Sequence, residues 1–132
     1  MNAFIVSGQD RPGEMARVAE AIAERGVNIT NITCVAWGGQ GAIALLTNDE
    51  PATRSLLSAK GFPYREVELV ACTLEDKPGT LAEAMRKLAD AGVNIEACMP
   101  TGMSGNKVSI ALATSDPAKA RETLGTGAVA HA

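Results

Sequence analysis

The stretch Asp10–Met15 (DRPGEM) returns almost unchanged as Asp76–Leu81 (DKPGTL). Each copy follows a short apolar run and precedes a helix-like pattern. At the same shift, 76 − 10 = 66, Gly26–Ile29 (GVNI) falls on Gly92–Ile95 (GVNI). A match at one shift along the chain is the mark of an internal duplication. The sequence therefore predicts two domains, residues 1–66 and 67–132.

One repeat predicts the element order βαββαβ. Pro12 suits the first turn of a helix, and Gly26 suits the left-handed position that ends it. β-branched residues predict a strand over residues 28–37, and the GGQG run at 38–41 predicts a hairpin turn. The expected strands of the first unit are Ala3–Gly8, Asn28–Trp37, Ala42–Thr47 and Phe62–Glu66, with a second helix holding Leu56 and Leu57, capped by Thr47 or Asp49.

The second repeat predicts the same order. Its expected strands are Leu69–Leu74, Ile95–Thr101, Val108–Thr114 and a short final strand at Gly127–Ala132. Gly102–Gly105 is expected to turn, and Asp116-Pro117 is a strong helix start. Each unit then has the α+β, ferredoxin-like fold, an antiparallel sheet with helices on one face.

Apolar residues at helical spacing predict the core side of each first helix. These stripes are Met15, Val18 and Ile22 in one unit and Leu81, Met85 and Leu88 in the other. The three cysteines, Cys34, Cys72 and Cys98, sit in apolar settings and are expected to be buried free thiols. Trp37, Met99 and Met103, near the turn ends of their strands, are expected to serve packing or an interface.

The joint between the repeats, Tyr64–Glu75, contains neither glycine nor proline. We expect the last strand of the first unit to run almost directly into the first strand of the second, with the units rigidly related. A bare sheet face and an exposed edge strand in each small unit favour pairing of the units and a homodimer.

Composition excludes several classes of function. The net charge is −3 and no basic run occurs, which argues against nucleic acid as a partner. No apolar stretch suits a membrane span and no signal peptide opens the chain, so a cytoplasmic protein is expected. The only histidine is His131, and no nucleophile or metal-ligand spacing is present. We expect no catalytic residue, no metal and no cofactor.

The repeated motif has a chemistry of its own. A helix that begins after a tight Pro-Gly turn has free N–H groups that favour a carboxylate. Asp10 and Asp76 could receive an ammonium group, and Asn28 and Asn94 open a neighbouring strand with donors and acceptors. Together these groups suit a free α-amino acid. The alternative is that the Asp residues only cap a turn and the Asn residues only follow the glycine that ends the helix.

These motifs resemble the ACT domain, present twice and covering nearly the whole chain. The resemblance implies a regulatory module that binds an amino acid, usually between two such domains, with an enzyme or regulator as a partner. The chain has no room for a catalytic domain, so it resembles a free-standing tandem ACT protein. An adaptor that uses the pair only for protein–protein interaction is the alternative.

The two expected sites differ, because Glu14 places a charge where it would compete with a carboxylate, whereas Thr80 adds a hydroxyl. The expected ligand-binding residues are Asp10, Arg11, Pro12, Gly13, Glu14, Met15, Asn28, Ile29 and Asn31 in the first unit, and Asp76, Lys77, Pro78, Gly79, Thr80, Leu81, Asn94, Ile95 and Glu96 in the second.

Overall fold

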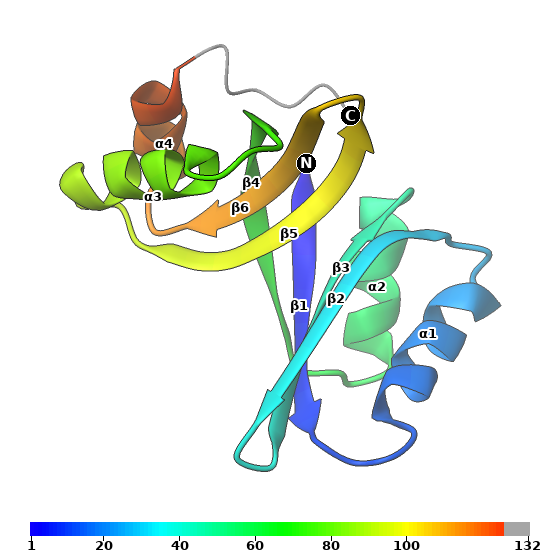
Figure 1. Ribbon diagram of the computed structural model, residues 1–132. Coiled ribbons are helices and arrows are strands. Elements are labelled where there is room, and N and C mark those ends of the chain that lie inside the picture. The colour runs from blue at the N-terminus through cyan, green and yellow to red at the C-terminus, as the bar shows by residue number, and fades with distance from the viewer. Residues whose placement is uncertain (126–132) are drawn as a thin grey trace. The chain divides into compact units, whose positions relative to one another are not determined.

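The computed structural model describes residues 1–125, and its contacts divide the chain into two units. The first unit spans Asn2–Val67. Its sheet has the strand order β2-β3-β1-β4, and both helices lie on one face of it (Figure 1). The elements are β1 (Asn2–Gln9), α1 (Glu14–Glu24), β2 (Ile29–Trp37), β3 (Gln40–Thr47), α2 (Glu50–Ala59) and the start of β4 (Tyr64–Glu75).

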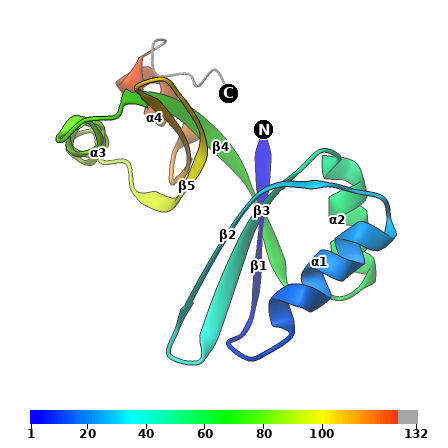
Figure 2. The ribbon, with the colours of Figure 1, turned by 45° about the vertical axis from the view of Figure 1, so that its right-hand side comes forward.

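The second unit begins at Glu68 and repeats the layout, with the strand order β4-β6-β5. Figure 2 shows its two helices on one side of these strands. The elements are the end of β4, α3 (Thr80–Asp90), β5 (Ile95–Ser104), β6 (Lys107–Thr114) and α4 (Pro117–Leu124). The α+β, ferredoxin-like fold is confirmed. The expected final strand, Gly127–Ala132, lies outside the described residues.

Strand β4 runs without a break through Tyr64–Glu75, where we expected Phe62–Glu66 and Leu69–Leu74 as separate strands. This confirms that the chain passes directly from one strand into the next. Without glycine or proline, nothing in this stretch favours a turn. The rigid relation of the two units stays a prediction.

The hairpin turns are shorter than expected. Gly38 and Gly39, with φ of 61° and 81°, form a two-residue turn, and β3 begins at Gln40. Two successive positive φ angles match the twist of the flanking strands, which is why glycine is used there. In the second unit β5 continues to Ser104, so the expected turn at Gly102–Gly105 is wrong.

The core of each unit lies between the helices and one side of the sheet. Directly paired residues of antiparallel strands share a face, so Phe4 opposite Leu45 and Val6 opposite Ile43 mark the helix side. The buried cores are Phe4, Val6, Val18, Ala21, Ile22, Val27, Ile43, Leu45, Leu56, Leu57 and Phe62 in the first unit, and Val70, Cys72, Leu88, Val93, Ile110, Leu112 and Ala120 in the second.

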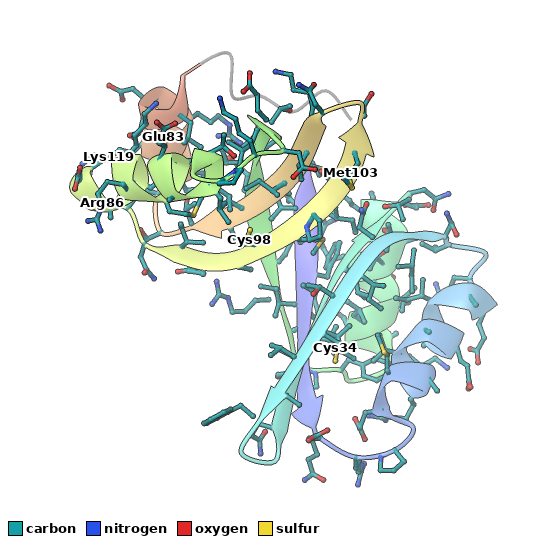
Figure 3. The ribbon with its side chains drawn as sticks, viewed as in Figure 1. Cys34, Glu83, Arg86, Cys98, Met103 and Lys119 are labelled. Atoms are coloured by element: carbon teal, nitrogen blue, oxygen red, sulfur yellow. The ribbon has the colours of Figure 1, made fainter. Side chains whose placement is uncertain are left out.

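Two expectations about the core are corrected, one on the first helix of each unit and one on strands β2 and β5. Met15 and Leu81 are 41% and 48% exposed, although both belong to the expected core stripes. Cys34 and Cys98 are exposed and only Cys72 is buried. Figure 3 shows the two exposed cysteines on β2 and β5. Both face the helix side, because Cys34 pairs with Ile43 and Cys98 with Leu112, but they lie at the margin of the helical cover.

An ion pair fixes helix α2 to the sheet of the first unit. Arg54 binds Glu66 through two nitrogens, at 2.6 and 2.8 Å, and the Asn2 side chain donates to Glu66 at 2.7 Å. Hydrogen bonds from Arg54 and then Asn2 lower the pKa of Glu66 to about 2. Arg121, the counterpart of Arg54 in α4, binds Glu68 at 2.6 Å in the second unit.

We expect Glu66→Gln to destabilise the protein at pH 7 and to matter less as the solution is acidified. A lowered pKa means that the ionised Glu66 stabilises the fold above the pKa of about 4.3 that a glutamate has when unfolded. This contribution is lost as the pH falls toward about 2. Urea denaturation of both proteins at several pH values measures the difference. Glu20→Gln, on the exposed face of α1, is the charge-matched control, and a difference that grows in acid would contradict the assignment.

Candidate functional site

The two copies of the motif form the same turn between a strand and a helix. The backbone N–H of Asp10 donates to Gly39 O at 3.0 Å, and that of Asp76 donates to Asn106 O at 2.7 Å, so each turn is tied to the hairpin of its own unit. Gly13 and Gly79 have φ of 91° and 95° and stand just before α1 and α3. Only glycine adopts this conformation without strain.

The first helix of each unit starts without a side-chain cap, whereas the second helix of each unit has one. Gly13 and Gly79 have no side chain to accept the first N–H groups of α1 and α3. At α2 and α4 the same need is met, because Asp49 accepts from Ala52 N and Asp116 from Lys119 N, each at 3.0 Å. The open N–H groups of a helix, together with its dipole, favour an anion. The motif thus leaves a carboxylate-binding feature open in both units.

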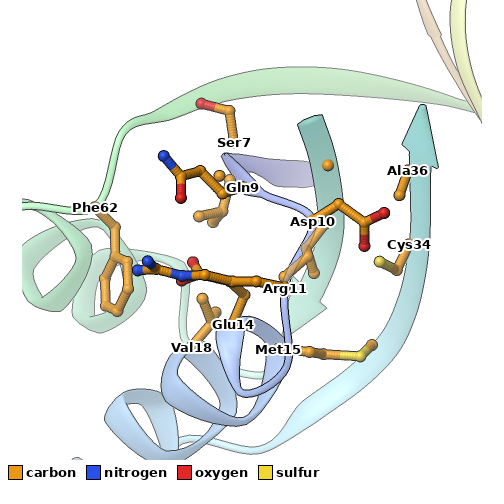
Figure 4. Close-up of a pocket in the computed structure, with 14 residues that line it drawn as sticks. Ser7, Gln9, Asp10, Arg11, Glu14, Met15, Val18, Cys34, Ala36 and Phe62 are labelled. Atoms are coloured by element: carbon orange, nitrogen blue, oxygen red, sulfur yellow. The ribbon is translucent and has the colours of Figure 1, made fainter. Parts of the chain in front are cut away.

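In the first unit this helix start borders a cavity of about 160 Å³ (Figure 4). Asp10 and Met15 point toward Cys34 and Ala36 on β2, while Arg11 extends toward Phe62. The wall is mainly apolar and the polar groups gather on the motif side. The lining residues are Val6, Ser7, Gly8, Gln9, Asp10, Arg11, Glu14, Met15, Val18, Cys34, Ala36, Gly41, Ile43 and Phe62.

Glu14 binds arginine rather than the helix start. Its carboxylate meets Arg11 Nε at 2.6 Å and an Arg17 nitrogen at 3.4 Å, and its side chain is 17% exposed. The hydrogen bond from Arg11, with the charge of Arg17 further away, lowers the pKa of Glu14. The expected competition with a bound carboxylate is therefore weakened, because two cations already hold this anion.

The second unit fills the same region differently. Thr80 Oγ1 donates to Glu75 O at 2.7 Å and lies 3.2 Å from Lys77 O. Lys77 binds Glu75 at 3.0 Å and lowers the pKa of that carboxyl. A more polar hollow beside the motif is lined by Lys77, Lys87 and Lys107, but neither Asp76 nor Leu81 borders it.

The asparagines lie away from the motif of their own unit. β1 and β2 are both antiparallel to β3, so Asn28, which precedes β2, stands at the opposite end of the sheet from Asp10. The N–H of Asn28 donates to Asn48 Oδ1 and that of Asn94 to Ser115 Oγ, each at 3.0 Å. The structure therefore gathers Asp10–Met15 without Asn28, Ile29 and Asn31, and Asp76–Leu81 without Asn94, Ile95 and Glu96. A site shared between units stays a prediction.

Several cavity residues were missed by sequence reasoning. Gly8, Gly41, Cys34 and Ala36 line the cavity and were not expected there. A signal was available in the duplication. Gly8 falls on Leu74 at the shift of 66, and Gly41 falls on Val108 at the shift of 67. Small residues in one copy and large apolar residues in the other indicate that the floor beneath the motif differs between the two units.

Residues 3–36 match the ACT domain family. The first unit therefore matches the ACT domain family over about half of its length. The matched part runs from β1 through α1 to β2 and contains the whole motif turn of the first unit. This confirms the resemblance seen in the sequence.

Solved structures share the fold along most of the chain. Protein BT0572 from Bacteroides thetaiotaomicron is 20% identical, with a TM-score of 0.78, over 93% of this chain and 85% of that one. The ligand-free regulatory subunit of aspartate kinase from Thermus thermophilus is 20% identical, with a TM-score of 0.62, over 93% and 87%. The corresponding subunit from Thermus flavus is 21% identical, with a TM-score of 0.65, over the same shares. No curated protein matches the sequence.

Within residues 1–125, no helix combines the length and apolar character that crossing a membrane requires.

Proposed function

We propose that this chain is a non-catalytic regulatory ACT domain protein that binds a free amino acid and signals its level. The observation that carries the proposal is the uncapped start of α1 and α3, beside a motif aspartate, in a chain whose other helices are capped by Asp49 and Asp116. A free α-amino acid presents a carboxylate for the open N–H groups and an ammonium group for an aspartate. The fold shared with regulatory subunits of aspartate kinase supports this reading.

The proposed site takes its main-chain donors from Gly13–Met15 or Gly79–Leu81. Asp10 or Asp76 receives the ammonium group. Asn28 or Asn94 completes the pocket from another unit, because neither lies near the motif of its own unit. The two ACT domains, residues 1–66 and 67–132, are proposed to act as a cytoplasmic homodimer that communicates with an enzyme or regulator. Light scattering at micromolar concentration tests the dimer, and a monomer mass would contradict it.

Calorimetric titration against the twenty amino acids tests the binding itself. We expect heat with at least one of them. In the double variant Asp10→Ala, Asp76→Ala, binding should weaken by about 1.5–3 kcal/mol for each charged hydrogen bond that is lost. Asp90→Ala is the matched control, because Asp90 is an exposed carboxylate at the far end of α3, 3.7 Å from Arg86. Unchanged affinity in the double variant would show that the aspartates only support the turn.

An adaptor is the second candidate, and the hairpin ends favour it. Trp37 is 90% exposed, and Met103, near the end of the corresponding hairpin in the second unit, is 72% exposed. Large apolar side chains exposed near the hairpin ends of both units suit contact with another protein. If no amino acid gives heat with the wild-type protein, the sensing function fails and the adaptor remains.

A further inference from the structure

We propose that only the first unit has an amino-acid pocket, so that each chain binds one ligand, and that this ligand has an apolar side chain. The inference rests on the proposed function and assigns its site and ligand class. It is carried by a row of residues that crosses the sheet under the start of the first helix.

In the first unit this row consists of small residues on three adjacent strands. Gly8 on β1 pairs with Gly41 on β3, and Gly41 pairs with Ala36 on β2. Paired residues share a face, and Gly8 follows Phe4 and Val6 at alternate positions, so the row faces the helices. All three residues line the cavity. They form its floor, and the cavity is open because they have little or no side chain.

In the second unit the same row is made of large apolar residues. Leu74 on β4 pairs with Val108 on β6, and Val108 pairs with Met103 on β5. Leu74 and Val108 are partly buried and pack against the core of that unit. Leu74 and Val108 therefore fill the part of this region that glycine leaves open in the first unit, and the hollow of about 330 Å³ beside the second motif has a different lining. The hollow beside this motif has no lining residue from β5. Leu74 and three lysines are among the residues that line it.

The lining of the first cavity decides the class of ligand. Val6, Val18, Ile43 and Phe62 surround the floor, whereas Asp10, Arg11 and Glu14 stand on the motif side. An apolar cavity of about this size holds a group such as benzene. A polar side chain that reached the apolar part of the cavity would lose its hydration there, because the polar lining residues Ser7, Gln9, Asp10, Arg11 and Glu14 belong to the end of β1 and the motif. The ligand is accordingly an α-amino acid whose ammonium and carboxylate meet the motif while an aliphatic or aromatic side chain enters the cavity.

The floor can be rebuilt with the residues that the second unit already uses. Gly8→Leu reproduces Leu74, and Gly41→Val reproduces Val108. Neither glycine has a positive φ, so the backbone tolerates a side chain. A Cβ atom at Gly8 would lie 3.1 Å from Glu14 Oε2, so the Glu14 carboxylate would have to shift by a few tenths of an ångström against its arginine partners. A Cβ atom at Gly41 would lie 3.7 Å from Val35 O, which is an ordinary contact. Gly102→Leu is the control, because Gly102 has open space, lacks a positive φ and borders neither hollow.

Calorimetry with leucine, isoleucine, valine, methionine and phenylalanine, beside serine, threonine, aspartate and lysine, tests the inference, with circular dichroism to verify folding. We expect one molecule of an apolar amino acid to bind to each chain. The loss of side-chain burial should weaken binding by about 10- to 150-fold in Gly8→Leu and in Gly41→Val. Gly102→Leu should bind within about twofold of the wild type, which is well inside one tenfold step of 1.4 kcal/mol.

Two ligands per chain, a preference for a polar amino acid, or normal binding in folded Gly8→Leu and Gly41→Val would overturn the inference and leave the proposed function standing. If one variant does not fold, the other decides. If the wild-type protein binds none of the twenty amino acids, the proposed function fails and this inference fails with it.

Discussion

Replacing Phe4 by alanine is expected to lower the free energy of unfolding by about 3–5 kcal/mol. Phe4 is fully buried on β1, where it pairs with Leu45 and meets the ring of Tyr64 with centroids 5.9 Å apart. With aromatic residues at only 3% of the chain, few side chains are large enough to fill the space that would be left. The substitution removes both the burial of the ring and its packing against neighbouring residues, and a cavity remains.

Urea denaturation followed by far-ultraviolet circular dichroism measures this loss. Tryptophan fluorescence is a poor probe here, since Trp37 is 90% exposed and senses little of the core. Phe4→Leu is the graded control, because it keeps most of the apolar volume and should cost clearly less than Phe4→Ala. A loss below about 1 kcal/mol in Phe4→Ala would mean that the site collapses around the smaller side chain, contrary to a well-packed core.

The fold was predictable because the duplication let each element be identified twice. A motif such as Asp-x-Pro-Gly is weak evidence when it occurs once. The same motif at two places, each followed at the same distance by Gly-Val-Asn-Ile, fixes the strand–helix–strand order. The depth of burial was less predictable. Helical periodicity shows which side of a helix is apolar, but not how far the helix lies over the sheet, and for this reason Met15 and Leu81 were wrongly expected in the core.

The candidate site was predictable only in part. The motif indicates where open N–H groups occur, and Asp10, Arg11, Glu14 and Met15 do border the cavity. The floor could not be derived from periodicity, because it depends on which residues of β1, β2 and β3 stand in one row. This register is set by the two-residue turn at Gly38-Gly39. The sequence predicted a four-residue turn at 38–41, which would have paired different residues of the two strands. The row is defined by the observed pairing and not by the spacing of residues along any one strand.

Replacing both turn glycines, Gly13→Ala together with Gly79→Ala, is expected to lower the free energy of unfolding by about 2–4 kcal/mol. Each glycine has a φ above 90°, and an L residue pays roughly 1–2 kcal/mol in the left-handed region. A Cβ atom at either position would have no atom within 4 Å, so the cost is conformational and not steric. The two turns belong to separate units, and the effects of independent sites add to within about 0.5 kcal/mol.

The single variants and one control separate this cause from a general effect of added methyl groups. Gly102→Ala adds the same atom in equally open space, but at a residue without positive φ, and should change the free energy of unfolding by no more than about 0.5 kcal/mol. Equal stability of Gly13→Ala and the wild type would mean that the turn before α1 is not left-handed. The N–H groups of that helix would then not be presented as the proposed site requires. The stability of these variants therefore tests the geometry of the site without any knowledge of the ligand, because the conformation that makes alanine costly is the one that opens the helix start.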